Sequence, residues 1–118
     1  MAGPAKNGVL IYSNDISNLA EFYQQLFGMS VLRKTDDLVS LVTDGFNLVI
    51  HVPPFELPSA VFSPVKLFLT VEHMATARAA ALRLGGQAFD GEWRNPLFSV
   101  CNIADCDGNH IQLRQFNQ

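Results

Sequence analysis

The sequence has few charged residues, few cysteines and no long apolar run, and each shortage excludes a class of protein. Charged residues make up 16% of the 118 residues, the net charge is −3, and the eight Lys and Arg are scattered. A nucleic-acid partner is therefore not expected. No run approaches the roughly 20 apolar residues of a membrane span, and no basic segment followed by an apolar one opens the chain, so we expect neither a membrane anchor nor a secretory signal.

The two cysteines, Cys101 and Cys106, are too few for a disulfide scaffold. A reducing, cytoplasmic location is the expectation that follows. Apolar residues are 48% of the chain, which is enough for a hydrophobic core, so a disordered chain is excluded. The length predicts a single domain over residues 1–118.

The first half of the chain reads as a strand, a helix and three strands. The apolar run 9–12 predicts the first strand. Apolar residues at helical spacing (Leu19, Phe22, Tyr23, Leu26) predict a helix that Gly28 ends. Residues 14–18 offer several N-caps, and the spacing of Asn18 and Glu21 fits a capping box. Strands are expected over 29–34, 38–43 and 46–52.

The second half repeats this order. A strand is expected over 65–71, and Met74, Ala77, Ala81 and Leu84 mark one face of a helix that Gly85-Gly86 ends. Three strands are expected over 87–90, 97–103 and 110–115. Asp15 matches Glu72 and Gly28 matches Gly85, each pair 57 residues apart. The repeat predicts two βαβββ modules, at about 7–52 and 65–116.

A proline-rich, apolar linker over 53–64 joins the modules. Its four prolines forbid regular strand pairing. Its side chains Phe55, Leu57, Val61 and Phe62 are too apolar to stay exposed, since burying each is worth roughly 1.5–3 kcal/mol. We expect the linker to pack on the domain, on a partner chain or over a pocket.

The pattern predicts an α+β fold in which each sheet has a helix on one face only. Two such sheets can form a curled mixed sheet around a cleft, and the uncovered faces then line a small-molecule site. Strand alternation decides which side chains face that cleft.

Two motifs carry a family resemblance. Asp15, Leu19-Ala20-Glu21-Phe22-Tyr23 and Leu26-Phe27-Gly28 resemble the opening D-x-x-x-A-x-F-Y-x-x-x-L-G of the vicinal-oxygen-chelate superfamily, which contains glyoxalases, bleomycin-resistance proteins and extradiol dioxygenases. The run 105–113, from Asp105 to Leu113, resembles its closing D-P-D-G-N-x-[IV]-E-[LF] hairpin, with Cys106 in place of the proline. The resemblance covers nearly the whole chain and implies the glyoxalase fold and a homodimer.

The resemblance also implies four metal-ligand positions, which fall on Gly8, His51, Lys66 and Gln112. Gly8 has no side chain, and a protonated Lys66 repels a cation. Of the four positions, only His51 and Gln112 carry a suitable donor. Outside the four, His110 could supply a further nitrogen near Gln112. Two ligands of four do not make a Zn²⁺, Ni²⁺ or Fe²⁺ site, so no cofactor is expected. If a metal were bound, His51 and Gln112 would hold it.

The expected ligand-binding cleft combines aromatic, cationic and amide side chains. Its candidate residues are Tyr12, His51, Lys66, Phe68, Trp93, Arg94, Gln112 and Arg114. Trp93 and Arg94 are expected in a loop over 91–96, as a recognition or interface element. Ordinary alternatives stand beside these roles: Lys66 as a solvated strand-end lysine, and His51 as a hydrogen-bonding partner of the linker.

Three hypotheses for the function remain. The first is a metal-free protein that binds a drug or metabolite, as in the bleomycin-resistance branch. The second is a glyoxalase-like lyase, isomerase or dioxygenase, either metal-dependent or using His51 as a general base with Lys66 stabilising an enolate. The third is a non-catalytic interaction subunit whose cleft is filled by its own side chains.

Overall fold

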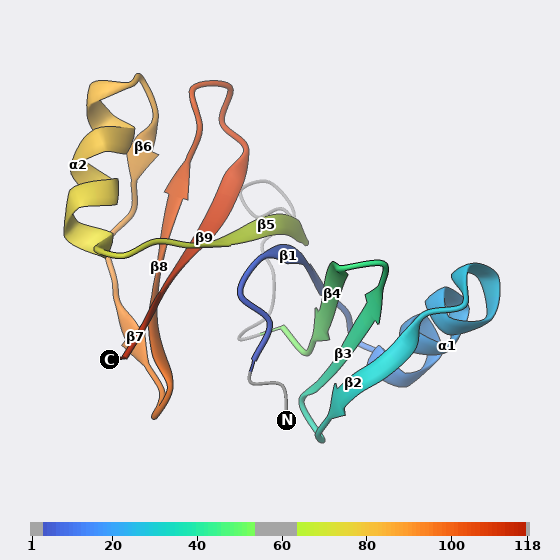
Figure 1. Cartoon of the computed structure of the whole chain (residues 1–118). Coiled ribbons are helices and arrows are strands. Elements are labelled where there is room, and N and C mark those ends of the chain that lie inside the picture. The colour runs from blue at the N-terminus through green and yellow to red at the C-terminus, as the bar shows by residue number, and fades with distance from the viewer. Residues whose placement is uncertain (1–3, 54–63, 118) are drawn as a thin grey trace. The chain divides into compact units, whose positions relative to one another are not determined.

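The computed structural model describes residues 4–53 and 64–117. The chain divides into two compact units, Met1–Val65 and Lys66–Gln118. Each unit holds one helix and its own set of strands, as Figure 1 shows. The predicted packing of the linker over 54–63 lies outside the described residues. Within the described part of the chain, no helix is both long and apolar enough to span a membrane.

Unit 1 has the predicted βαβββ order. Its elements are β1 (Gly8–Tyr12), α1 (Ile16–Phe27), β2 (Ser30–Lys34), β3 (Leu38–Thr43) and β4 (Phe46–His51). The strands are ordered β2-β3-β4-β1. β1 pairs with β4 in parallel, and the other neighbours pair antiparallel, so the sheet is mixed and open.

Helix α1 is capped by Asp15, one of the several N-caps that the sequence offered. The Asp15 carboxylate accepts a hydrogen bond from the Asn18 backbone N–H at 3.1 Å. Asn18 therefore lies in the first turn, and the capping box of Asn18 and Glu21 is wrong, because Asp15 already satisfies that N–H. The predicted end at Gly28 is confirmed, with a left-handed φ of 68°.

The core of unit 1 lies between α1 and one face of its sheet. Ala20 packs against four strand residues, Val39, Leu41, Leu48 and Ile50. Leu19 and Tyr23 join this core as predicted. Phe22 and Leu26, which the spacing placed on the same face, are more than half exposed together with Phe27. Part of the apolar surface of α1 therefore does not pack on the sheet.

Unit 2 departs from the predicted pattern by one strand. Its elements are β5 (Val65–Thr70), α2 (Met74–Arg83), β6 (Gln87–Ala88), β7 (Trp93–Arg94), β8 (Phe98–Ala104) and β9 (His110–Phe116). The order is β5-β9-β8-β6, and β7 also pairs with β8. β5 and β9 are parallel, whereas β8 pairs antiparallel with β9, β6 and β7.

The predicted strand over 87–90 and the predicted loop over 91–96 are both corrected by this pairing. β6 pairs with one end of β8, at Ala104 and Ile103, and β7 pairs with Val100 and Ser99 further along it. Gly91 lies between the two short strands with a φ of +108°. This left-handed residue interrupts one edge strand and lets the chain rejoin β8.

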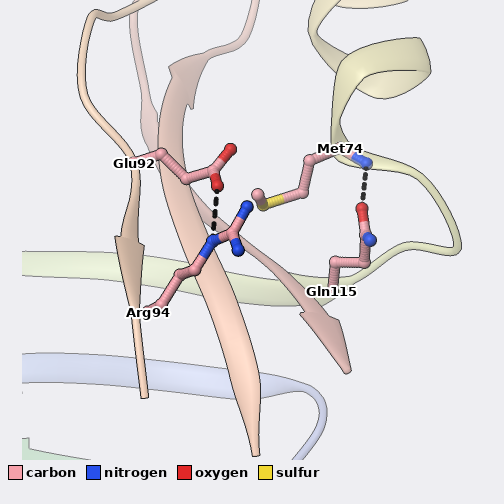
Figure 2. Close-up of polar contacts among 4 residues, drawn as sticks. All are labelled: Met74, Glu92, Arg94 and Gln115. Atoms are coloured by element: carbon pink, nitrogen blue, oxygen red, sulfur yellow. Dashed lines mark hydrogen bonds and ion pairs between the residues drawn. The ribbon is translucent and has the colours of Figure 1, made fainter. Parts of the chain in front are cut away.

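Helix α2 covers one face of the unit 2 sheet. Met74, Cys101 and Leu113 form the buried cluster, against which Ile103 and Ile111 pack. His73 precedes the helix but makes no side-chain capping bond. Instead, the Gln115 side-chain oxygen of β9 accepts a hydrogen bond from the Met74 backbone N–H at 2.8 Å (Figure 2). A side chain that is distant in the sequence therefore satisfies a backbone N–H that a local N-cap would otherwise satisfy.

Candidate functional site

The sheet face opposite α2 in unit 2 gathers most of the predicted cleft residues, and we call it the Lys66 face. Cys101 and Leu113 pack with Met74 of α2, so their side chains lie on the α2 face of the sheet. Alternate residues of each strand, and their register partners, therefore lie on the opposite face. The side chains on the Lys66 face are Lys66, Phe68 and Thr70 from β5, Gln87 from β6, Trp93 from β7, Phe98, Val100, Asn102 and Ala104 from β8, and His110, Gln112, Arg114 and Phe116 from β9.

Lys66 is a buried amine held by a neutral partner. Lys66 is 6% exposed, and its Nζ donates a hydrogen bond to Asn102 Oδ1 at 3.1 Å. Burial lowers the pKa of the Lys66 amine to about 8 because the charged form loses hydration. The interpretation of Lys66 as a solvated strand-end lysine is therefore wrong.

Arg114 is the second buried cation of this face, and aromatic rings flank it. It is 7% exposed, and its Nε donates to Gln112 Oε1 at 3.0 Å. Its Cζ lies 3.9 Å from the centre of the Phe68 ring and 4.9 Å from that of Phe98. These contacts are in the range of cation–π interactions, which hold the guanidinium plane in place.

The short strand β7 sends its two predicted site residues to opposite faces. Trp93 is the register partner of Val100 and lies on the Lys66 face, whereas Arg94 is the partner of Ser99 and lies on the α2 face. Arg94 Nε pairs with Glu92 Oε2 at 3.2 Å, and Figure 2 shows this pair beside the Met74–Gln115 contact. Arg94 is thus not brought together with Arg114.

The other two predicted residues, Tyr12 and His51, meet in unit 1. They are register partners at the ends of β1 and β4, on the sheet face opposite α1, with ring centroids 6.3 Å apart. His51 Nδ1 lies 2.7 Å from the Val52 carbonyl oxygen. Because a carbonyl oxygen only accepts, Nδ1 is the donor, and the Nε2 of a neutral ring is left as an acceptor.

The donor set does not fit the metal that the fold family implies. Gly8 begins β1, whereas His51 ends β4 beside Tyr12, so these two positions lie at opposite ends of one strand pair. Lys66 donates a hydrogen bond and is no ligand while protonated. Among residues 4–53 and 64–117, no group of three or more His, Cys, Asp or Glu could hold a metal ion. The chemistry of these residues therefore gives no support to a metal centre.

Asn102 and Phe98 belong to the Lys66 face but were not among the predicted site residues. Both lie on β8, where Asn102 is the partner of Gln112 and Phe98 the partner of Phe116. The alternation of the run 98–104 could have indicated them, once its pairing with 110–116 was assumed.

Comparison with known proteins identifies the class to which this fold belongs. Residues 8–114 match the family model of the glyoxalase-like domain. The chain therefore belongs to that family and to the vicinal-oxygen-chelate superfamily, as the two motifs predicted. No curated protein matches the sequence.

Solved structures at low sequence identity share the fold. A glyoxalase/bleomycin resistance protein/dioxygenase superfamily member from Vibrio splendidus is 15% identical with a TM-score of 0.68, covering 95% of this chain and 98% of its own. Methylmalonyl-CoA epimerase from Mycobacterium tuberculosis is 13% identical with a TM-score of 0.63, covering 100% and 94%. A structure described as NAD-dependent benzaldehyde dehydrogenase from Legionella pneumophila is 14% identical with a TM-score of 0.73, covering 94% and 99%. Such identities establish the fold alone.

Proposed function

We propose that this protein binds a small molecule at the Lys66 face and does so without a resident metal. The observation that carries the proposal is the pair of buried cations, Lys66 and Arg114, held by the side-chain amides of Asn102 and Gln112. Burying a cation costs stability, and a hydrophobic side chain of similar size would fill the same space more cheaply. Side chains retained at such a cost are typical of binding sites.

A panel of organic acids, amides, amines and sugars tests this proposal on the metal-free protein. Trp93, the single tryptophan of the chain, lies on the Lys66 face, so its emission reports on that face. At least one compound is expected to change the emission and raise the Tm, and Lys66→Met is expected to reduce both effects. Arg94→Gln is the matched control, because Arg94 lies on the opposite face.

Two results would contradict the proposal. In the first, no compound of the panel binds. In the second, every compound that binds does so equally well to the Lys66→Met protein.

A second candidate is a metal-independent lyase or isomerase with His51 as its general base. The hydrogen bond from Nδ1 to the Val52 carbonyl favours it, because this bond orients the ring with Nε2 as the proton acceptor. If this candidate holds, product forms from a bound compound, as NMR would detect, and His51→Ala abolishes turnover. His73→Ala serves as the control, since His73 is exposed beside α2. Binding without product leaves the binding protein as the account.

A further inference from the structure

We propose that the ligand of the Lys66 face is an organic carboxylate on an apolar or aromatic frame, with Lys66 and Arg114 recognising its charged end. The inference rests on the proposed binding function and adds the chemical class of the ligand. Three features of the face support it: its charge, the fixed geometry of the guanidinium, and the position of its aromatic rings.

The charge of the face has one sign. Lys66 and Arg114 are the lysine and the arginine of this face, and none of the strand positions that face this side carries Asp or Glu. The side chains that accept hydrogen bonds from Lys66 Nζ and Arg114 Nε, Asn102 and Gln112, are neutral amides. A cationic ligand would be repelled here, and an anionic one attracted, more strongly than in water because the site is buried.

The guanidinium of Arg114 is held in an orientation that suits a planar group with two oxygens, such as a carboxylate. The bond from Nε to Gln112 Oε1 fixes one edge of the fork, and Phe68 at 3.9 Å restrains its plane. An arginine held in this way loses little freedom on binding a carboxylate, which its fork matches in shape. The Lys66 amine adds a point charge on the same face.

The aromatic side chains place the apolar part of the ligand. The rings of Phe98 and Phe116 lie 5.0 Å apart on the Lys66 face. Trp93 is the partner of Val100, and Val100 is the partner of Arg114, so Trp93 lies two strands from Arg114, about 10 Å away. A molecule with a carboxylate at one end and a ring at the other spans this distance and contacts both kinds of side chain.

Benzoate, benzamide and benzamidine test the inference, because they share a ring and differ in charge. We measure their affinity for the full chain by saturation-transfer NMR and Trp93 emission. Benzoate is expected to bind about tenfold or more tightly than benzamide, and benzamidine not to compete with it. Lys66→Met should weaken benzoate about tenfold while benzamide binding is unchanged, and Arg94→Gln should alter neither.

The comparison among the three ligands needs no variant, so it stands even if Lys66→Met fails to fold. Equal or tighter binding of benzamide or benzamidine overturns the inference and leaves the proposed function in place. If none of the three binds, the charge of the panel compounds that do bind decides. Anionic ones support the inference, neutral or cationic ones overturn it, and a panel without any binder overturns both proposals.

Discussion

Lys66 is the residue at which this chain departs most from the metal enzymes that it resembles. It stands at one of the four positions that the resemblance assigns to metal ligands, and its burial makes it costly in the charged form. Its Nζ binds an amide oxygen, not a carboxylate, in the contact with Asn102. The Lys66 amine is therefore mostly charged at pH 7 and loses its proton at about pH 8.

This residue predicts a rise in stability at alkaline pH. The folded amine loses its proton at about pH 8, whereas the unfolded chain keeps it until its ordinary pKa of 10.5. Between these values the unfolded state binds more protons, so the free energy of unfolding increases as the pH rises from about 8 to 10.5. Below pH 8 both states are charged, and the penalty for burying the charge is present in full.

Chemical unfolding across this pH window measures the effect. Lys66→Met is expected to remove the rise, and Lys34→Met, which changes an exposed lysine of β2, is expected to keep it. His110 and Arg114 are the other titratable or charged side chains of the Lys66 face, and both are unchanged in the comparison. A rise of the same size in the Lys66→Met protein would contradict the assignment.

At the scale of the elements, the end of α2 packs against β8 through a glycine. Gly86 donates its backbone N–H to the Ala81 carbonyl at 2.8 Å. A Cβ at this position would overlap the backbone carbonyl oxygen of Ala104, the last residue of β8. Gly86 is thus required by close approach, and not by its φ angle.

Gly86→Ala is expected to lower the free energy of unfolding by about 2–3 kcal/mol, as overpacking does. Gly28→Ala is the matched comparison, because Gly28 also follows a helix but has open space around its Cβ position. Its φ of +68° should cost about 1 kcal/mol. Urea unfolding of both variants gives the two values, and equal losses would rule out the close approach as the reason for Gly86.

The elements show how far local sequence determines the fold. The strand over 38–43 was predicted with its correct bounds, because a short run rich in apolar and β-branched residues between turn residues is recognised without a distant partner. β6 and β7 are two residues each, and their pairing depends on β8, which lies later in the chain. Local patterns therefore could not separate them from a loop. The capping of α2 by Gln115 is long-range in the same way.

In the candidate site, too, local sequence predicted some positions and not those that depend on distant pairing. Parity along a strand predicted that Gln112 and Arg114 share a face, and their hydrogen bond shows this. The same reasoning could not assign Arg94, since its face follows from the register of β7 on β8. The burial of Lys66 was also beyond local patterns, because exposure depends on what packs around a strand.

At the scale of the whole molecule, the exposed apolar side chains of unit 1 suggest a surface that a second protein chain covers. Phe22, Leu26 and Phe27 of α1, with Val31 and Leu32 of β2, are each more than a third exposed. Apolar surface of this kind on a small protein is typical of an interface. The homodimer that the resemblance implies would cover it.

Light scattering of the purified protein measures the molar mass directly. We expect twice the 13.0 kDa of one chain. Phe22→Ser is expected to shift the equilibrium toward the monomer, and Leu82→Ser in unit 2, also at an exposed apolar residue, to leave it unchanged. A monomer at all concentrations would contradict the homodimer.

Independence from metal is the central claim of this account, and one measurement tests it most directly. Binding of benzoate, or of whichever panel compound binds, is titrated by Trp93 emission in the protein as purified and after exhaustive chelation. The account predicts the same Kd in both, since Lys66, Arg114 and their amide partners are all supplied by the chain. Loss of binding on chelation, restored by one equivalent of Zn²⁺, Ni²⁺, Mn²⁺ or Fe²⁺, would contradict it.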